Sequence, residues 1–172
     1  MTIRTDRLLL RPLCLSDLKT VHEYACDSEN TKYMLFLPNT TEQETEDFLS
    51  SVEQEWQQEH PSFFEFAIVL DGIQIGAVSI SLGELTNQGE IGWILNKKYW
   101  NRGYVSEAAK AVLDFAKTQL HLQRVIAQCD WRNIASAKVM QKIGMRLSDE
   151  NGTRTYVKRE ETARELTYMI EF

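Results

Sequence analysis

The segment from Trp100 to Ala108, which reads WNRGYVSEA, contains residues that could bind a phosphate group. It lies between a predicted strand and a predicted helix. Backbone N–H groups at a helix start, together with the helix dipole, attract anions. Arg102 adds a positive charge, and Gly103 has no side chain to keep a phosphate from the backbone. The segment therefore fits an anion-binding loop, although an ordinary glycine turn explains the same residues.

A second polar pair, Asn133 and Ser136, precedes the apolar residues of another predicted helix. Asn133 is a preferred N-cap residue, and Ser136 falls in the first helical turn. Capping alone accounts for both residues. Alternatively, both side chains face a ligand bound at that end of the helix.

Composition excludes several classes of protein. The chain has 172 residues, a formal net charge of −6, and only three cysteines and three histidines. This acidity argues against a nucleic-acid partner, which requires a basic face. No four cysteine or histidine residues are spaced as a zinc site would require, so we expect no metal and reduced thiols. No signal peptide and no apolar run long enough for a membrane span occur, which predicts a cytoplasmic protein with no membrane partner. GxGxxG and GxxxxGK[ST] patterns are missing.

Hydrophobic periodicity predicts one α/β (α+β) domain over residues 1–172, with a mixed, mostly antiparallel sheet that contains several hairpins and is flanked by helices. Expected helices begin after N-caps at Ser16, Thr41 and Asn133, and a fourth contains Val105 to Ala116. The second carries an apolar stripe of Phe48, Leu49, Val52 and Trp56, and Asp71-Gly72 predicts a hairpin turn. The charged run Lys158 to Glu165 is expected to be a solvated connection between strands. The expected strands are Thr5–Arg11, Phe63–Leu70, Ile73–Leu82, Glu90–Leu95, Arg124–Asp130, Arg154–Val157 and Leu166–Phe172.

These patterns together resemble the GNAT superfamily of N-acetyltransferases over nearly the whole chain. WNRGYVSEA resembles the family's phosphate loop, Q/R-x-x-G-x-G/A, with Gly103 as the central glycine. Glu90–Leu95 (EIGWIL) resembles the family's fourth strand, and Asn133-x-x-Ser136 followed by Gly144-Met145 resembles its second conserved block. The opening TDRLLLRPL and the segment Glu29 to Leu49 resemble the ribosomal-protein N-terminal (RimJ/RimL-type) branch.

The resemblance implies acetyl-CoA as co-substrate and a sheet whose fourth and fifth strands splay apart. The pantetheine arm would lie against Ile94 and Leu95, with Asn133 and Ser136 facing it. The pyrophosphate would be held by the loop of Asn101, Arg102, Gly103, Tyr104, Val105 and Ser106. Trp100 and Val105 depart from the family's loop pattern. Met140 stands where many relatives carry a proton-donating tyrosine, so that role is vacant or moved to another residue.

Catalytic roles are assigned to Glu90 and, for the departing thiolate, to Ser136. Alternation along the strand puts Glu90, Gly92 and Ile94 on one face. A carboxylate in a largely apolar strand can act as a general base, and relatives place a catalytic glutamate at the matching position. Glu90 could instead be a charge that simply reaches solvent.

The acceptor pocket is predicted from Tyr33, Met34, Phe36 and Trp93, which could equally be core residues. Cys129, on the predicted strand near the thiol, is more simply a buried cysteine.

The predicted reaction is acetyl transfer from acetyl-CoA to a protein N-terminal amine. One alternative is a small-molecule amine: a polyamine, an amino sugar or an aminoglycoside. Another, of a different class, is a CoA-binding sensor or a catalytically silent relative. The exposed edge strands of a mixed sheet permit a monomer or a homodimer.

Overall fold

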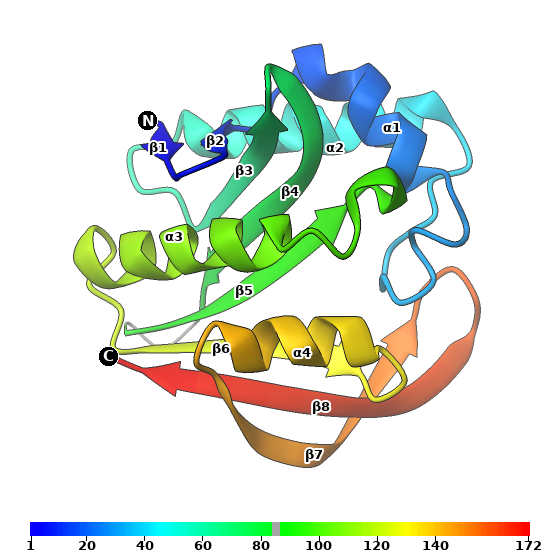
Figure 1. Cartoon of the computed structure of the whole chain (residues 1–172). Helices are drawn as coiled ribbons and strands as arrows, with labels where there is room; N and C mark the ends of the chain where they lie inside the picture. Colours follow the sequence, from blue (N-terminus) through cyan, green and yellow to red (C-terminus); the bar gives the residue numbers. More distant parts are fainter. Residues whose placement is uncertain (84–86) are drawn as a thin grey trace.

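The computed structural model describes residues 1–83 and 87–172, and Figure 1 shows their arrangement. The α/β class and the mixed, mostly antiparallel sheet predicted from the sequence are confirmed. Four α-helices occur in these ranges: α1 Leu18–Ala25, α2 Glu42–Trp56, α3 Tyr104–Thr118 and α4 Ile134–Lys142. The strands are β1 Ile3–Arg4, β2 Leu9–Pro12, β3 Phe63–Leu70, β4 Ile73–Leu82, β5 Gln88–Leu95, β6 Arg124–Asp130, β7 Arg146–Tyr156 and β8 Glu161–Glu171.

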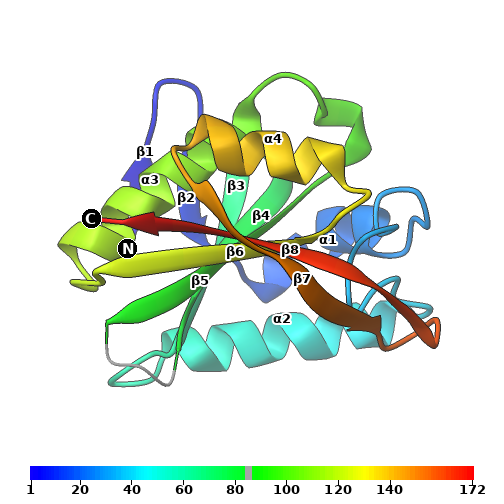
Figure 2. The same ribbon diagram turned by 90° about the horizontal axis from the view of Figure 1, so that it is seen from below.

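The strands of the described residues form one sheet in the order β1-β2-β3-β4-β5-β6-β8-β7. All neighbours are antiparallel except β5 and β6, which are parallel. Figure 2 shows this sheet between two layers of helices, with α3 and α4 on one face and α1 and α2 on the other. None of the described helices is long and apolar enough to cross a membrane.

The sheet splits between β5 and β6. These strands correspond to the family's fourth and fifth strands, whose separation the resemblance predicted. These strands pair only where Gln88–Glu90 lies beside Arg124–Ile126. Beyond that point β5 continues to Leu95 and β6 to Asp130 while the two ribbons diverge (Figure 1). Backbone groups of β5 from Ile91 onward therefore have no strand partner in β6. The split lies below the start of α3 and beside α4.

A hydrophobic core fills each face of the sheet. On the α3 and α4 face, Phe66, Ile80 and Ile91 pack with the apolar side of α3 and with Met140. On the α1 and α2 face, Ala67 and Ala77 pack with Leu49 and Val52 of α2 and with Val21 and Tyr24 of α1. Alternation along β3 and β4 sends successive side chains into these two cores.

Local signals in the sequence account for some helix ends and fail at others. Thr41 and Glu44 form the predicted capping box of α2. Ser16 is not an N-cap, because a 3-10 turn, Leu15–Asp17, precedes α1 and Asp17 occupies its N-cap position. The predicted apolar stripe of α2 is wrong at Phe48, which is 40% exposed.

The first predicted strand is wrong in its bounds. Residues Thr5 to Leu8 form a turn between β1 and β2, in which the Leu8 amide donates to the Thr5 hydroxyl and the Thr5 amide donates to the Leu8 carbonyl. This turn was not predicted, because it contains no glycine or proline and runs directly into the three leucines of Leu8 to Leu10.

The C-terminal hairpin is longer than the sequence predicted. β7 begins at Arg146 rather than Arg154, and β8 begins at Glu161 rather than Leu166. The run Lys158 to Glu165 is therefore not a solvated connection, since its second half is strand and Glu165 is buried. Cross-strand pairing and ion pairs hold these polar residues in the sheet. The periodicity of apolar residues therefore did not reveal the full length of the two strands.

Candidate active site

The loop before α3 presents an open helix end. Asn101 and Gly103 both adopt left-handed backbone conformations, with φ of 60° and 79°. Gly103 is the N-cap of α3, and no side chain caps this end. The first amide with a partner inside the helix is that of Glu107, which donates to the Gly103 carbonyl. The preceding amides, those of Tyr104, Val105 and Ser106, can therefore donate hydrogen bonds to an anion.

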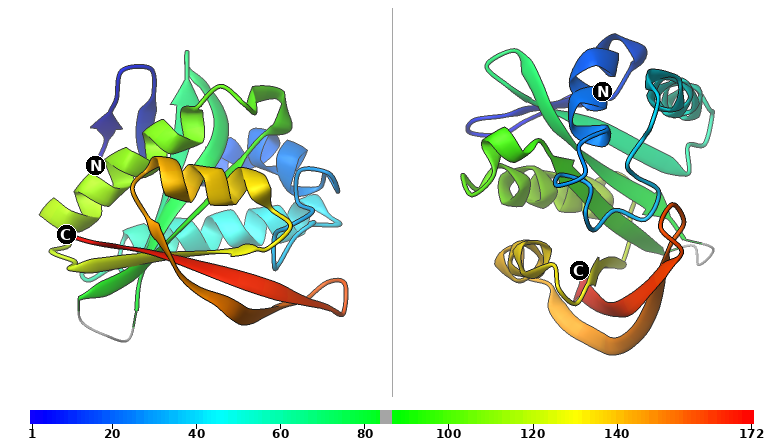
Figure 3. Two further views of the ribbon diagram at one scale, coloured as in Figure 1. Left: turned by 60° about the horizontal axis from the view of Figure 1, so that its bottom comes forward. Right: turned by 90° about the vertical axis from the view of Figure 1, so that its right-hand side faces the viewer.

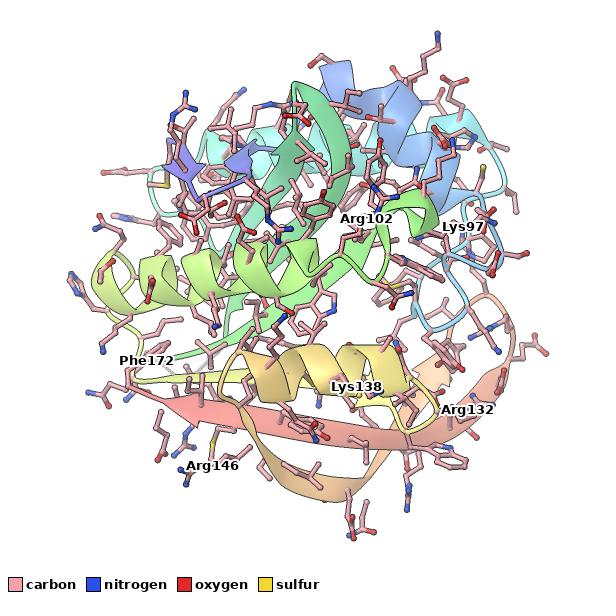
Figure 4. The ribbon with its side chains drawn as sticks, in the orientation of Figure 1. Lys97, Arg102, Arg132, Lys138, Arg146 and Phe172 are labelled. Carbon is pink, nitrogen blue, oxygen red and sulfur yellow. The ribbon has the colours of Figure 1, made fainter. Side chains whose placement is uncertain are left out.

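Two side chains of this loop, Trp100 and Arg102, contact residues that precede it in the chain. The Trp100 indole N–H donates to the Leu95 carbonyl at 2.8 Å and so ties the loop to the last residue of β5. The Arg102 guanidinium lies 6.0 Å from the ring centroid of Tyr99. Figure 4 shows Arg102 just before α3 and Lys138 on α4, on the same face of the molecule.

Two further cations, Arg7 and Lys142, flank Gly103. A Cβ atom built on Gly103 would lie 3.6 Å from the Arg7 Nη2 atom and 3.6 Å from the Lys142 Nζ atom. The Arg7 guanidinium pairs with Glu107 at 2.6 Å and donates to the Arg102 carbonyl at 3.0 Å. Sequence reasoning missed both cations, since no spacing links positions 7, 103 and 142; only the fold brings them together.

The start of α4 lies on the same face of the sheet as the start of α3. The Asn133 side chain accepts a hydrogen bond from the Ser136 amide at 3.1 Å and so caps the helix. Ser136 is partly exposed, whereas Met140, one turn further, is buried in the core. Cys129 is buried on β6, and burial raises the pKa of its thiol to about 11. This thiol therefore remains protonated at neutral pH.

Glu90 lies on the other face of the sheet. Register with β4 puts Glu90 opposite Ser81 and Ile94 opposite Ala77, on the side of α1 and α2. Trp93 has the opposite orientation and packs against the core beneath α3. The structure thus separates Trp93 from Glu90, although the sequence analysis assigned both to the acceptor side.

The carboxyl group of Glu90 has an elevated pKa. Although the residue is exposed to solvent, partial desolvation of its carboxyl group raises the pKa, and repulsion from Glu165 raises it further. Arg154 acts in the opposite direction. A carboxylate with a raised pKa holds a proton more readily, which is what a general base requires. Sequence reasoning missed Glu165 because Lys158–Glu165 was predicted to be a loop. It missed Arg154 because the predicted strand Arg154–Val157 did not reveal which strand it pairs with.

The loop between α1 and α2 lies over the same end of the split. Tyr33 and Met34 are partly buried there, while Phe36 is 68% exposed. The Val157 amide, at the tip of the β7–β8 hairpin, donates to the Leu35 carbonyl at 3.1 Å. The right-hand view of Figure 3 shows this loop meeting the hairpin. Together the loop and the hairpin border the split on the face that carries Glu90.

The site therefore has two halves, one on each face of the split sheet. The uncapped amides of α3 and the cations beside Gly103, which could bind phosphate, lie on the α3 and α4 face. The carboxylate with the raised pKa and the loop bearing Tyr33 lie on the opposite face. Two reactants held in these halves would meet at the split, where β5 has unpaired backbone groups. Among the described residues, no three histidine, cysteine, aspartate or glutamate side chains are grouped to hold a metal ion.

Comparison with known sequences agrees with this geometry. Residues 7–146 match the family described as Acetyltransferase (GNAT) domain. The uncharacterized N-acetyltransferase YnaD of Bacillus subtilis is 37% identical over 85% of this chain and 83% of that protein. The spermidine N(1)-acetyltransferase of Escherichia coli is 23% identical over 82% of this chain and 74% of that protein.

Solved structures show the same fold. A GNAT-family acetyltransferase from Bacillus anthracis superposes with a TM-score of 0.86 at 33% identity, over 99% of this chain and 98% of that one. RimL, a ribosomal L7/L12 alpha-N-protein acetyltransferase solved with coenzyme A, superposes with a TM-score of 0.88 at 16% identity, over 100% of this chain and 98% of that one. At that identity the second likeness concerns the fold alone.

Proposed function

The chain belongs to the GNAT acetyltransferase family and is an acetyl-CoA-dependent N-acetyltransferase, and we propose that its acceptor is the α-amine of a protein N-terminus. Residues 1–172 form one catalytic domain in this proposal. Bound acetyl-CoA supplies an acetyl group activated as a thioester. The residues of this chain must then hold that donor, orient the amine and move a proton.

The donor half fits the phosphates and the arm of CoA. Asn101 to Ser106 offer the uncapped amides at the start of α3, and Arg7 and Lys142 supply positive charge beside Gly103. These local groups bind a polyanion even though the net charge of the whole chain is −6. Ile94 and Leu95 lie on the part of β5 that β6 leaves unpaired, where a pantetheine arm can lie like a strand.

The acceptor half centres on Glu90, and the position of this carboxylate where β5 and β6 separate, on the α1 and α2 face, carries the proposal. Its raised pKa is consistent with that role. An attacking amine must first lose its proton. An α-ammonium group has a pKa of about 8, against about 10.4 for a lysine side chain, so its proton costs roughly 3 kcal/mol less to remove. A carboxylate base therefore favours an α-amine over a more basic amine, such as that of a lysine side chain or a polyamine.

Ser136 is the proposed hydrogen-bond donor to the departing thiolate. It lies in the first turn of α4 and is partly exposed. Met140 cannot serve, since it is buried and has no proton to donate. Tyr33, Met34 and Phe36 would contact the acceptor from the loop above Glu90. Trp93 contributes only through the opposite face of β5.

The relatives themselves differ in acceptor. RimL is described as acting on a protein α-amine, whereas the other named enzyme acts on spermidine. Each is less than 25% identical to this chain, so neither decides between the two acceptors. A small-molecule amine is thus the rival outcome of the test. Cytoplasmic location and a monomeric or homodimeric state remain predictions.

An acceptor panel tests the proposal. Thiol release from acetyl-CoA is measured with a short peptide bearing a free N-terminus, with the same peptide blocked at its N-terminus, and with spermidine. We expect the free peptide to be the preferred acceptor and Glu90→Gln to lower its kcat about 100-fold. Glu46→Gln, on the exposed side of α2, is the matched control and should match the native protein. A preference for spermidine, or full activity of Glu90→Gln, would contradict the proposal.

A further inference from the structure

Arg154 and Glu165 lie on the face of the sheet that carries Glu90. Glu90 is opposite Ile126 in β6, and two alternations further along β6 Asp130 is opposite Glu165 in β8. Glu165 in turn faces Gly152 in β7, two residues before Arg154. Directly paired residues and residues two apart share a face of a sheet. The C-terminal hairpin therefore brings both charged side chains to the acceptor half of the site.

Arg154 is buried, and its Nε atom is left without a partner. Arg154 and Glu165 are each 9% exposed. Within the part of the chain that the structure describes, the Arg154 Nε–H is buried and makes no hydrogen bond. The Glu165 carboxylate is 3.5 Å away, close enough for ionic attraction but not for a bond of normal geometry. Buried donors of this kind are rarely left unpaired in folded proteins.

Other arginines of the chain show how such a group is normally satisfied. Arg11 donates two hydrogen bonds to Asp17, at 2.7 and 2.6 Å. Arg132 donates two to Asp130, at 2.9 and 2.7 Å. Asp130 is thereby fully engaged, because it also accepts a bond from the Tyr156 hydroxyl at 2.6 Å. Arg154 has no equivalent bond, although β8, which carries Glu165, is the strand between it and Asp130 of β6.

Arg154, Glu165 and Glu90 act on one another electrostatically. Repulsion from Glu165 raises the pKa of Glu90, and Arg154 lowers the pKa of both carboxyl groups. Glu65 of β3 lies on the same face but beyond Ser79 of β4. Asp130 is neutralised by Arg132. The two carboxylates and the guanidinium therefore lie on one face of the sheet, near enough to influence one another's charge.

This set of groups is complementary to an amine whose neighbouring carbon carries a carbonyl oxygen. Two carboxylates attract the ammonium group, and the guanidinium donates to the oxygen. A polyamine has ammonium groups but no oxygen, so it would leave the Arg154 Nε–H without a hydrogen-bond acceptor. Building on the proposed function, we propose that Glu165 orients the acceptor ammonium and Arg154 binds the carbonyl of the same α-aminoacyl group. A peptide N-terminus and a free amino acid share this chemistry.

The test compares two acceptors that differ at one carbon, which is a carboxamide in one and a methyl group in the other. Alaninamide and 2-aminopropane have the same branched carbon skeleton, and the kcat/KM ratio between them is measured for each variant. Comparison of ratios between variants cancels the different intrinsic reactivities of the two amines. We expect Arg154→Met to lower the ratio of alaninamide to 2-aminopropane about 10-fold or more, the value of a hydrogen bond to a charged group. Arg154→Lys, which keeps the charge, should lose less.

Arg164→Met is the matched control. Arg164 neighbours Glu165 on β8 but points away from the site, with its guanidinium 5.2 Å from the ring centroid of Trp131. It should leave the ratio unchanged. Glu165→Gln should raise KM for both amines and shift the acidic limb of the pH profile of kcat/KM downward, because the repulsion that raises the pKa of Glu90 is removed. A purely structural role would not move that limb.

Each result bears on one claim. If Arg154→Met lowers kcat/KM equally for both amines, or if the pH profile of Glu165→Gln is unchanged, the inference is overturned while a protein acceptor still stands. If free alanine exceeds alaninamide and this preference depends on Arg154, the inference holds and the protein acceptor fails. Should Arg154→Met fail to fold, Arg154→Lys and Glu165→Gln carry the same comparison.

Discussion

Lys142 gives the sharpest test of the donor half, because it is a single exposed cation at a defined position. Its Nζ atom lies 3.6 Å from the place where a Cβ on Gly103 would be. A phosphate accepting from the loop amides would lie about 5 Å from that ammonium group. The attraction between two unit charges at this distance is about 0.8 kcal/mol in water and about 3 kcal/mol at an effective dielectric constant of 20.

Replacement of Lys142 with methionine should therefore weaken CoA binding. Because Lys142 is exposed, we expect the lower part of that range, a 4- to 20-fold increase in Kd (about 0.8 to 1.8 kcal/mol). Isothermal titration calorimetry at low ionic strength measures it. The loss should shrink as salt is raised, since the Debye length falls to about 3 Å at 1 M.

Two comparisons make this prediction specific. Dephospho-CoA keeps the pyrophosphate but lacks the 3′-phosphate, and Lys142→Met should weaken its binding as much as that of CoA. Lys117→Met, in the last turn of α3 about 20 Å from Gly103, should bind CoA normally. Equal affinity of Lys142→Met and the native protein, or a loss that disappears with dephospho-CoA, would refute the placement of the pyrophosphate at Gly103.

Three further predictions concern the core and the chemistry. Burial raises the pKa of Glu65 from 4.5 to about 8, so between these pH values the folded protein keeps a proton that the unfolded chain releases. The free energy of unfolding should therefore fall as pH rises from 4.5 to 8. In thermal unfolding, Glu65→Gln should flatten this pH dependence. Gly76→Ala would put a Cβ atom 2.4 Å from the Ile94 carbonyl oxygen, and it should lower the free energy of unfolding by about 1–3 kcal/mol in chemical denaturation. Gly92→Ala should lower it less, because its Cβ would meet only the Ser79 hydroxyl, at 3.2 Å. Equal losses of stability would disprove the close approach at Gly76. Ser136→Ala should lower kcat about 10-fold or more with little change in KM, and an unchanged kcat would remove Ser136 from the reaction.

Much of the donor half could be predicted from sequence because it depends on local signals. Gly103 between a strand and a helix, and Asn133 three residues before Ser136, each occupy a helix start, and a helix start is encoded by neighbouring residues. Alternation along Glu90 to Leu95 correctly separated the two faces of β5. The same alternation puts Trp93 on the face opposite Glu90, so assigning both residues to the acceptor side was wrong.

The remaining site residues depend on pairing between distant strands. Arg7 reaches Gly103 through a turn that the leucine run concealed, and Arg154 reaches Glu165 through the register of a hairpin rich in charge. Neither relation leaves a periodic signal, because periodicity reports only which side of one element is apolar. Charged residues that pair across strands look like a loop when they are read one strand at a time.

The position of the transferred acetyl group tests the central claim most directly. A peptide with one free α-amine and one lysine side chain is incubated with the protein and acetyl-CoA, and tandem mass spectrometry locates the acetyl group. If Glu90 accepts a proton from an amine presented on the α1 and α2 face, the acetyl group will be on the α-amine, and Glu90→Gln will yield little product. Acetylation of the lysine side chain, or equal product from Glu90→Gln, would contradict the account.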